Sequence, residues 1–120
     1  MENYHLRAYA HIGDAVYEVF IREKVIKQTS NSKKMHELTT KHVKAEFQLE
    51  ALEYLMPMLS EEETEIVRRA RNMPSTTFRR AQQSLHRQAT AFEALLGYNY
   101  IHNKTRYNEL LSFLEKIIDL

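Results

Sequence analysis

Two carboxylic acids stand inside stretches that are otherwise apolar, and they are the strongest candidates for chemistry. Asp14 lies within residues 10–16, and Glu93 lies within residues 91–97. Both stretches are predicted to be helical core, where a carboxylate is costly unless it is protonated, paired or bound to a metal. Two such acids favour one shared divalent ion. Because the chain has no cysteine, oxygen ligation suits Mg²⁺ or Mn²⁺ better than zinc.

Simpler roles for the two acids stay open at this point. Asp14 could cap a helix that begins after Gly13, and Glu93 could simply face solvent. Each acid also has cationic side chains nearby in the sequence with which it could pair: Arg7 and Arg22 for Asp14, and Arg87 for Glu93.

The chain has only two glycines, and each lies beside one of these acids. Gly13 adjoins Asp14, and Gly97 follows Glu93 by one helical turn. A glycine inside a helix costs about 1 kcal/mol relative to alanine. Its use is to let another backbone or a ligand come close. The simplest arrangement that needs both glycines is a crossing of the two helices, which brings the two carboxylates together.

The positive charge of the chain is concentrated in one segment that contains no acid. The formal net charge is only +1, yet residues 66–92 carry six arginines, which leaves eleven basic and sixteen acidic groups elsewhere. Arginine suits bidentate contacts with phosphate better than lysine does. The segment therefore predicts a phosphate-binding surface, and the simpler interpretation is a solvated helix face followed by an irregular loop.

The composition favours an all-α fold with one domain over residues 1–120. Hydrophobic residues make up 43% of the chain and charged residues 28%, and two glycines with two prolines are too few for turn-rich β folds. Periodicity and capping signals predict five to seven helices, with the first apolar almost all the way round and therefore central. They are expected near residues 3–28, 33–56, 60–72, 80–103 and 105–118. The sequence leaves open whether residues 33–56 form one continuous helix or are kinked or split near residues 43–44.

No segment has the pattern of a secretory signal or of a membrane-spanning helix. The most apolar stretch, residues 6–21, is interrupted by four polar or charged residues: Arg7, His11, Asp14 and Glu18. The absence of cysteine also agrees with a reducing compartment. We expect a cytoplasmic protein that does not contact a membrane.

Two blocks of this sequence resemble the conserved blocks of the ribonuclease III family in residues, order and spacing. They are Ile-Gly-Asp-Ala-Val at residues 12–16 and Ala-Phe-Glu-Ala-Leu-Leu-Gly at residues 91–97. Residues 69–72, Arg-Ala-Arg-Asn, and 75–77, Ser-Thr-Thr, resemble the basic loop of the mini-ribonuclease III branch. Members of that branch are a catalytic domain alone, and from the length we expect no double-stranded-RNA-binding domain.

The resemblance implies a magnesium-dependent endoribonuclease, with Mn²⁺ as a substitute, that cleaves double-stranded RNA as a homodimer. The expected substrate is the precursor of large-subunit (23S) ribosomal RNA. Asp14 and Glu93 are implied as catalytic residues and metal ligands. The expected RNA contacts are Arg69, Arg71, Asn72, Thr76, Thr77, Arg79, Arg80 and Arg87.

The sequence also departs from the full-length members of the family. Those carry further acids where this chain has Arg7, Ala10 and Thr90, so fewer ligands remain than a fully ligated two-metal site needs. The alternative function is a non-catalytic RNA- or ribosome-binding helical module of the same fold. A protein-interaction domain is disfavoured by the arginine segment. Retention of both Asp14 and Glu93 favours the enzyme.

Overall fold

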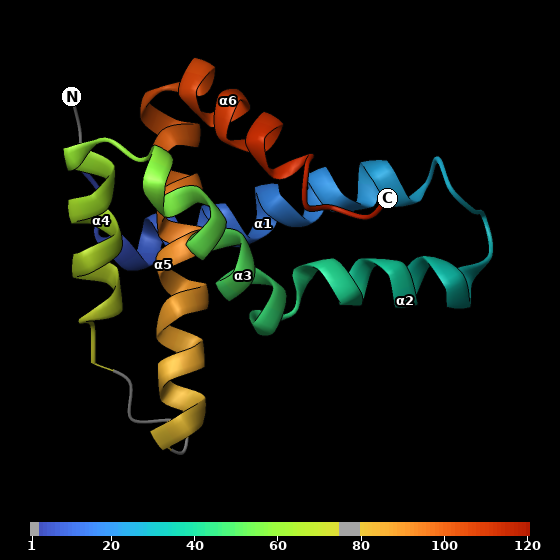
Figure 1. Cartoon of the computed structure of the whole chain (residues 1–120), viewed down its shortest axis with the longest axis horizontal. Coiled ribbons are helices and arrows are strands. Elements are labelled where there is room, and N and C mark those ends of the chain that lie inside the picture. The colour runs from blue at the N-terminus through green and yellow to red at the C-terminus, as the bar shows by residue number, and fades with distance from the viewer. Residues whose placement is uncertain (1–2, 75–79) are drawn as a thin grey trace.

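Helix α1 (Leu6–Val25) runs through the middle of the molecule, and helix α5 (Arg80–His102) crosses it (Figure 1). The structure, a computed structural model, describes residues 3–74 and 80–120, without the side chains of residues 80 and 81. The most extensive contact between any two described helices is the one between α1 and α5. This pair forms the frame on which the other helices pack.

The remaining helices surround this crossing. Helix α2 (Ser32–Val43) packs against α1, and helix α3 (Ala45–Leu55) packs against α5. A short 3-10 turn, η1 (Met56–Met58), leads to helix α4 (Glu61–Arg71), which lies alongside α5 (Figure 1). Helix α6 (Lys104–Leu114) follows α5 and closes the side above the crossing in this view. The described residues form no strand, which confirms the predicted all-α fold.

The helix ends differ in detail from the predicted ones. The helix expected over residues 33–56 is split at Lys44, whose extended backbone (φ −65°, ψ 156°) ends α2 and precedes α3. The first helix is shorter than residues 3–28, because His5 caps it through an Nδ1 that accepts a hydrogen bond from the amide of Arg7 at 3.0 Å. The last helix ends at Leu114 instead of near residue 118 and continues as a turn.

The two glycines allow α1 and α5 to touch through their backbones. A Cβ atom on Gly13 would lie 1.7 Å from the carbonyl oxygen of Glu93, and one on Gly97 would lie 1.8 Å from the carbonyl oxygen of Tyr9. No side chain fits in either place. The crossing predicted from the glycines is confirmed. At the crossing, the turn of α1 that carries Asp14 contacts the turn of α5 that carries Glu93.

One face of α1 is not covered, which corrects the prediction of a helix that is buried almost all round. Tyr17 and Ile21 are fully buried against the other helices, whereas Ala8, Ala15 and Val19 are exposed, Val19 by 56%. The apolar pattern therefore reflects two faces, one in the core and one on the surface. No helix in the described part of the chain is long and apolar enough to cross a membrane.

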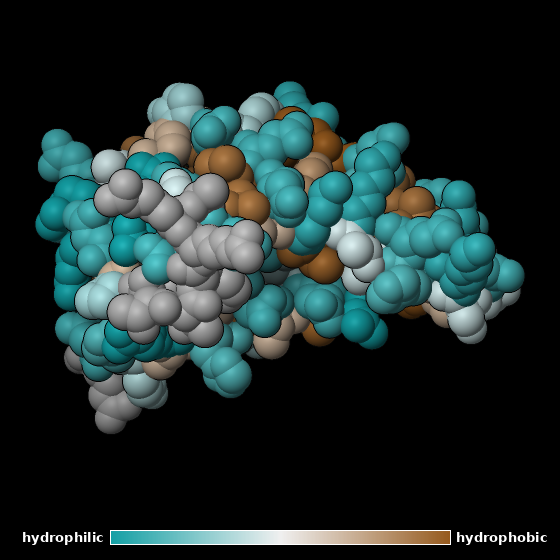
Figure 2. All heavy atoms as spheres, turned by 90° about the horizontal axis from the view of Figure 1, so that it is seen from below, coloured by the Kyte–Doolittle hydropathy of each residue, from teal (hydrophilic) through white to brown (hydrophobic). Residues whose placement is uncertain are grey.

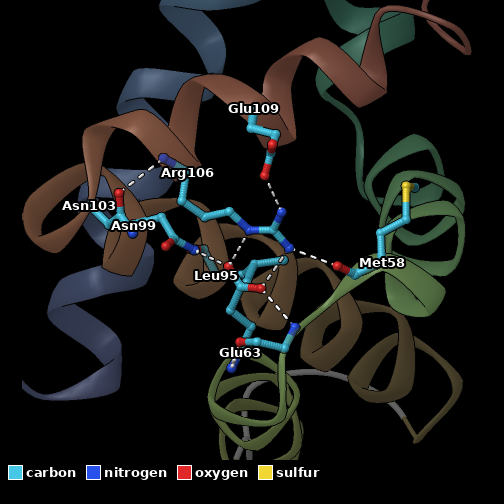
Figure 3. Close-up of polar contacts among 8 residues, drawn as sticks. Met58, Glu63, Leu95, Asn99, Asn103, Arg106 and Glu109 are labelled. Carbon is cyan, nitrogen blue, oxygen red and sulfur yellow. Dashed lines mark hydrogen bonds and ion pairs between the residues drawn. The ribbon is translucent and has the colours of Figure 1, made fainter.

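A buried carboxylate fastens α4 to the rest of the fold (Figure 3). Ser60 and Glu63 form the predicted capping box at the start of α4. The Arg106 side chain reaches Glu63 from α6, with Nε 2.9 Å from Oε2 and Nη2 2.8 Å from Oε1. Asn99 of α5 also donates a hydrogen bond to Glu63, at 3.0 Å. Three helices thus meet at one carboxylate.

Arg106 is itself held from several sides. Its Nη2 donates to the carbonyl oxygen of Met58 at 2.7 Å, and its Nη1 donates to Glu109. Its amide donates to the side chain of Asn103, which caps α6. This network fixes the start of α4, the helix whose last turn carries Arg68, Arg69 and Arg71.

Gly97→Ala is expected to destabilise the protein strongly. If helix propensity alone decided, alanine would add about 1 kcal/mol of stability. The new methyl group instead meets backbone at 1.8 Å, so the helices must separate, and we expect a loss of about 2 kcal/mol or more. Urea denaturation measures the change. A comparison of Glu53→Ala with Glu53→Gly, at an exposed position inside α3, serves as the control for propensity, and a more stable Gly97→Ala protein would contradict the crossing.

Glu63 should make the free energy of unfolding decrease as the pH is lowered. Burial alone would raise the pKa of Glu63, but hydrogen bonds from Arg106, the Ser60 amide and Asn99 outweigh it, and the pKa lies below its usual value. Glu63 therefore stabilises the fold above the unfolded-state pKa, and this stabilisation is lost as the pH falls through the folded-state pKa. Glu63→Gln should cost about 2 to 3 kcal/mol at pH 7. It should also show a weaker loss of unfolding free energy between pH 6 and 3; an unchanged pH dependence would contradict this.

Candidate functional site

A hollow of about 390 Å³ lies between α1, the end of α4 and α5. Its lining combines opposite charges with groups that donate hydrogen bonds: Asp14, Glu93, Arg7, Arg87, His11 and His86. Ala10 and Thr90 line the same hollow. The two acids singled out in the sequence are therefore brought to one surface, one from each of the crossing helices.

The two acids interact directly, and they differ in exposure. Glu93 is half-buried, and Asp14 is exposed, which corrects the expectation that both are core residues. Burial is the main cause that raises the pKa of Glu93 to about 8, followed by a hydrogen bond and charge repulsion with Asp14. Glu93 therefore keeps its proton at neutral pH, and a divalent cation bound between the two acids would displace that proton.

The simpler roles left open by the sequence do not hold among the described residues. Helix α1 runs without a break through Gly13, so Asp14 caps no helix. Arg22 pairs with Glu18 at 2.9 Å instead of with Asp14. Neither carboxylate of the pair forms an ion pair with a described arginine or lysine.

Gln48 is a buried neighbour of this pair that sequence analysis missed. Its Nε2 lies 3.0 Å from the carbonyl oxygen of Val43 and 3.4 Å from Oε2 of Glu93. Only 4% of Gln48 is exposed. A signal existed in the sequence, because an amide lies among the apolar residues just after the expected helix break. Its partner, however, is 45 residues away.

Described residues of the arginine segment lie at two hollows. Arg87 lines the hollow of the acid pair, whereas Arg69 and Asn72 line a second hollow of about 780 Å³, which shares Met73 and Pro74 with the first. Arg69 and Asn72 are exposed at the end of α4, while Arg71 is half-buried and donates from Nε to Gln88 at 2.7 Å. Arg87 is half-buried, and its Nε is buried without an acceptor among the described residues. Thr76, Thr77 and Arg79, and the side chain of Arg80, lie outside the described part.

Figure 2 views the molecule from the side on which α4 ends and α5 begins. Hydrophilic residues predominate on this face around the grey atoms, and the hydrophobic residues appear as separate small areas. An acid pair next to basic, hydrophilic surface is suited to holding a divalent cation and a phosphate at the same time.

Comparison with known proteins shows the family of this chain. The family model of the ribonuclease III domain matches residues 7–104, which include both acids and the arginine segment. The chain belongs to the ribonuclease III family. It is accordingly an endoribonuclease, in a family that acts on double-stranded RNA, and the prediction made from the two sequence blocks is confirmed.

Relatives that match this ribonuclease III chain include proteins named Mini-ribonuclease 3. That of Thermoanaerobacter sp. (strain X514) is 42% identical over 113 residues, covering 92% of this chain and 80% of the relative. That of Staphylococcus aureus (strain NCTC 8325 / PS 47) is 34% identical over 115 residues, covering 92% and 84%. These matches confirm the predicted branch of the family.

A solved structure shares the whole ribonuclease III fold of this chain. The crystal structure of protein FN1578 from Fusobacterium nucleatum aligns with a TM-score of 0.86 at 25% sequence identity. The alignment covers all of this chain and 98% of the other. The arrangement of helices that brings the two acids together is thus found in a solved structure as well.

Proposed function

We propose that this protein cleaves double-stranded RNA with Mg²⁺, and that Asp14 and Glu93 are the catalytic residues and hold the ion. The observation that carries the proposal is the pairing of the two acids, from crossing helices, in one hollow without an ion-paired cation among the described residues. The alternative of a non-catalytic RNA-binding module is less well supported. It gives no reason to place two repelling carboxylates where a phosphate would bind.

The side chains of the hollow fit Mg²⁺, with Mn²⁺ as a substitute. The donors are carboxylate oxygens, which these hard cations prefer. Burial, followed by the neighbouring Asp14, raises the pKa of Glu93, and a bound cation would favour its charged form. When bound, the ion would activate a water molecule and neutralise charge on the phosphate. Where full-length relatives carry further acids, this hollow is lined by Arg7, Ala10 and Thr90. Asp14 and Glu93 are therefore its acid ligands among the described residues.

The arginine segment supplies the contacts with RNA phosphates in this proposal. Arg69 and Asn72 are exposed for this purpose, and Arg87 lines the hollow itself with an Nε that lacks an acceptor in the described structure. Arg71, Thr76, Thr77, Arg79 and Arg80 belong to the same proposed surface. A-form RNA has a deep, narrow major groove, so these contacts would recognise shape, phosphates and 2′-hydroxyls more than sequence.

A second copy of the chain would cover the exposed face of α1. Ala8, Ala15 and Val19 are exposed and follow one another at helical spacing, with the exposed His11 between Ala8 and Ala15, which makes a largely apolar stripe beside Asp14. A homodimer built on this stripe would have its two hollows as neighbours, as cleavage of both strands of one duplex requires.

The proposed natural substrate is the duplex at the ends of the large-subunit (23S) ribosomal RNA precursor. Support comes from the match to the mini-ribonuclease III branch. Cells in which Asp14→Asn replaces the natural protein should accumulate unprocessed 23S precursor. Normal processing in such cells would exclude this substrate and leave cleavage of other duplexes open.

Asp14→Asn should abolish cleavage of an end-labelled RNA duplex in Mg²⁺. The amide offers the cation a single neutral oxygen in place of a charged carboxylate, so it binds the ion much more weakly, and we expect kcat to fall at least about a hundredfold. A chelator should have the same effect on the unchanged protein. Glu18→Gln, one turn further along α1 and outside the hollow, is the matched control. Full activity of Asp14→Asn would refute the site, and failure of every form to cleave would favour the binding module.

RNA affinity should fall steeply with salt, and Arg69 should account for part of that slope. A contact to one phosphate adds about one unit to the slope of log K against log salt. Arg69→Gln should therefore weaken binding at low salt and flatten the slope, with kcat at saturating RNA unchanged. Filter binding of a duplex to the Asp14→Asn protein measures this without cleavage. An unchanged slope would remove Arg69 from the surface.

Val19→Glu should convert a dimer to a monomer, because it places a charge in the middle of the apolar stripe. Light scattering after size-exclusion chromatography measures the mass. Thr64→Glu adds the same charge at an exposed position on α4 and should leave the mass unchanged. A dimer that survives Val19→Glu would show that the two copies meet elsewhere.

A further inference from the structure

Gln48 stands at a corner where the backbone needs a hydrogen-bond donor. Helix α2 ends at Val43, and the extended Lys44 separates it from α3. The last carbonyl groups of a helix have no amide of their own helix to bind. The Nε2 group of Gln48, from the first turn of α3, meets the carbonyl oxygen of Val43 at 3.0 Å. This contact fixes which end of the amide points there, since the opposite orientation would set two oxygens against each other.

The same nitrogen has a second hydrogen, and it is directed to the acid pair. Nε2 lies 3.4 Å from Oε2 of Glu93, and Gln48 favours the charged form of that carboxylate, opposing the effect of Asp14. One amide nitrogen thus joins the corner between α2 and α3 to a carboxylate on α5. Because Gln48 is buried, this connection runs through the interior of the protein.

The side-chain oxygen of Gln48 makes no stabilising contact with a described residue that would explain a glutamine at this position. Its Oε1 is buried and has no donor among the described residues. A buried unpaired acceptor destabilises a fold, and an apolar side chain of the same length would fill the space without it. The Val43 carbonyl oxygen takes one hydrogen of the amide, and the contact with Glu93 gives the other hydrogen its acceptor.

We propose that Gln48 is a positioning residue, which holds the Glu93 carboxylate in the orientation that binds the divalent ion. The inference rests on the proposed function. Hydrogen-bond donors behind a ligating carboxylate orient it, and their loss typically weakens metal binding or activity by about 10 to 100 times. Gln48 lines no part of the hollow, so RNA binding should not depend on it.

The test compares Gln48→Met with Tyr17→Phe. Methionine has nearly the same length as glutamine and donates no hydrogen bond. The matched control removes another buried hydrogen bond at the same corner, from the Tyr17 hydroxyl to the carbonyl oxygen of His42 at 2.7 Å, and it does not touch Glu93. Electron paramagnetic resonance of Mn²⁺ gives the metal affinity of each folded variant without turnover. Cleavage assays give kcat and KM for an RNA duplex.

We expect Gln48→Met to bind Mn²⁺ about tenfold more weakly, with kcat restored by excess metal and KM for RNA unchanged. Tyr17→Phe should keep the affinity of the unchanged protein. Equal affinities for the unchanged protein and Gln48→Met, or an equal loss in Tyr17→Phe, would overturn the inference. If Gln48→Met does not fold, Gln48→Asn, which is too short to reach both acceptors, makes the same comparison. Absence of Mn²⁺ binding to the unchanged protein would instead refute the proposed metal site itself.

Discussion

The direct backbone contact between α1 and α5 is the constraint on which the site depends. Gly13 lies against the backbone of Glu93, and Gly97 lies against the backbone of Tyr9, with no space for a Cβ at either place. At this separation the turns beside the glycines must face each other across the crossing. Asp14 follows one glycine and Glu93 precedes the other by a turn, so the crossing itself brings the two carboxylates to one hollow.

Bringing these acids together opposes stability, which gives the pair a functional meaning. Burial and the proximity of Asp14 raise the pKa of Glu93 to about 8, so the fold keeps a group that resists ionisation. The opposite case is Glu63, which is also buried but is surrounded by donors that keep its pKa low. One carboxylate is satisfied by the protein and fastens a helix. The other is left partly unsatisfied at a surface where a cation and a phosphate can reach it.

The sequence predicted local features and failed where a partner lies far along the chain. The capping box at Ser60 follows from short-range rules, and the two glycines predicted the crossing because they had no other use in a helical chain. Whether residues 33–56 form one helix or split near residues 43–44 was left open by the sequence, and the structure splits them at Lys44. The role of Gln48 was missed, since its contact with Glu93 spans 45 residues. The exposed face of α1 was read as core, because periodicity shows that a residue is apolar but does not show what covers it.

Anomalous diffraction from crystals soaked in Mn²⁺ tests the central claim most directly, because it locates the ion without reference to activity. We propose that the crossing of α1 and α5 positions one metal site that both helices share. We expect a manganese peak bonded to oxygens of both Asp14 and Glu93, and no such peak in crystals of the Asp14→Asn protein. A peak bound elsewhere, with the two carboxylates unligated, would contradict it.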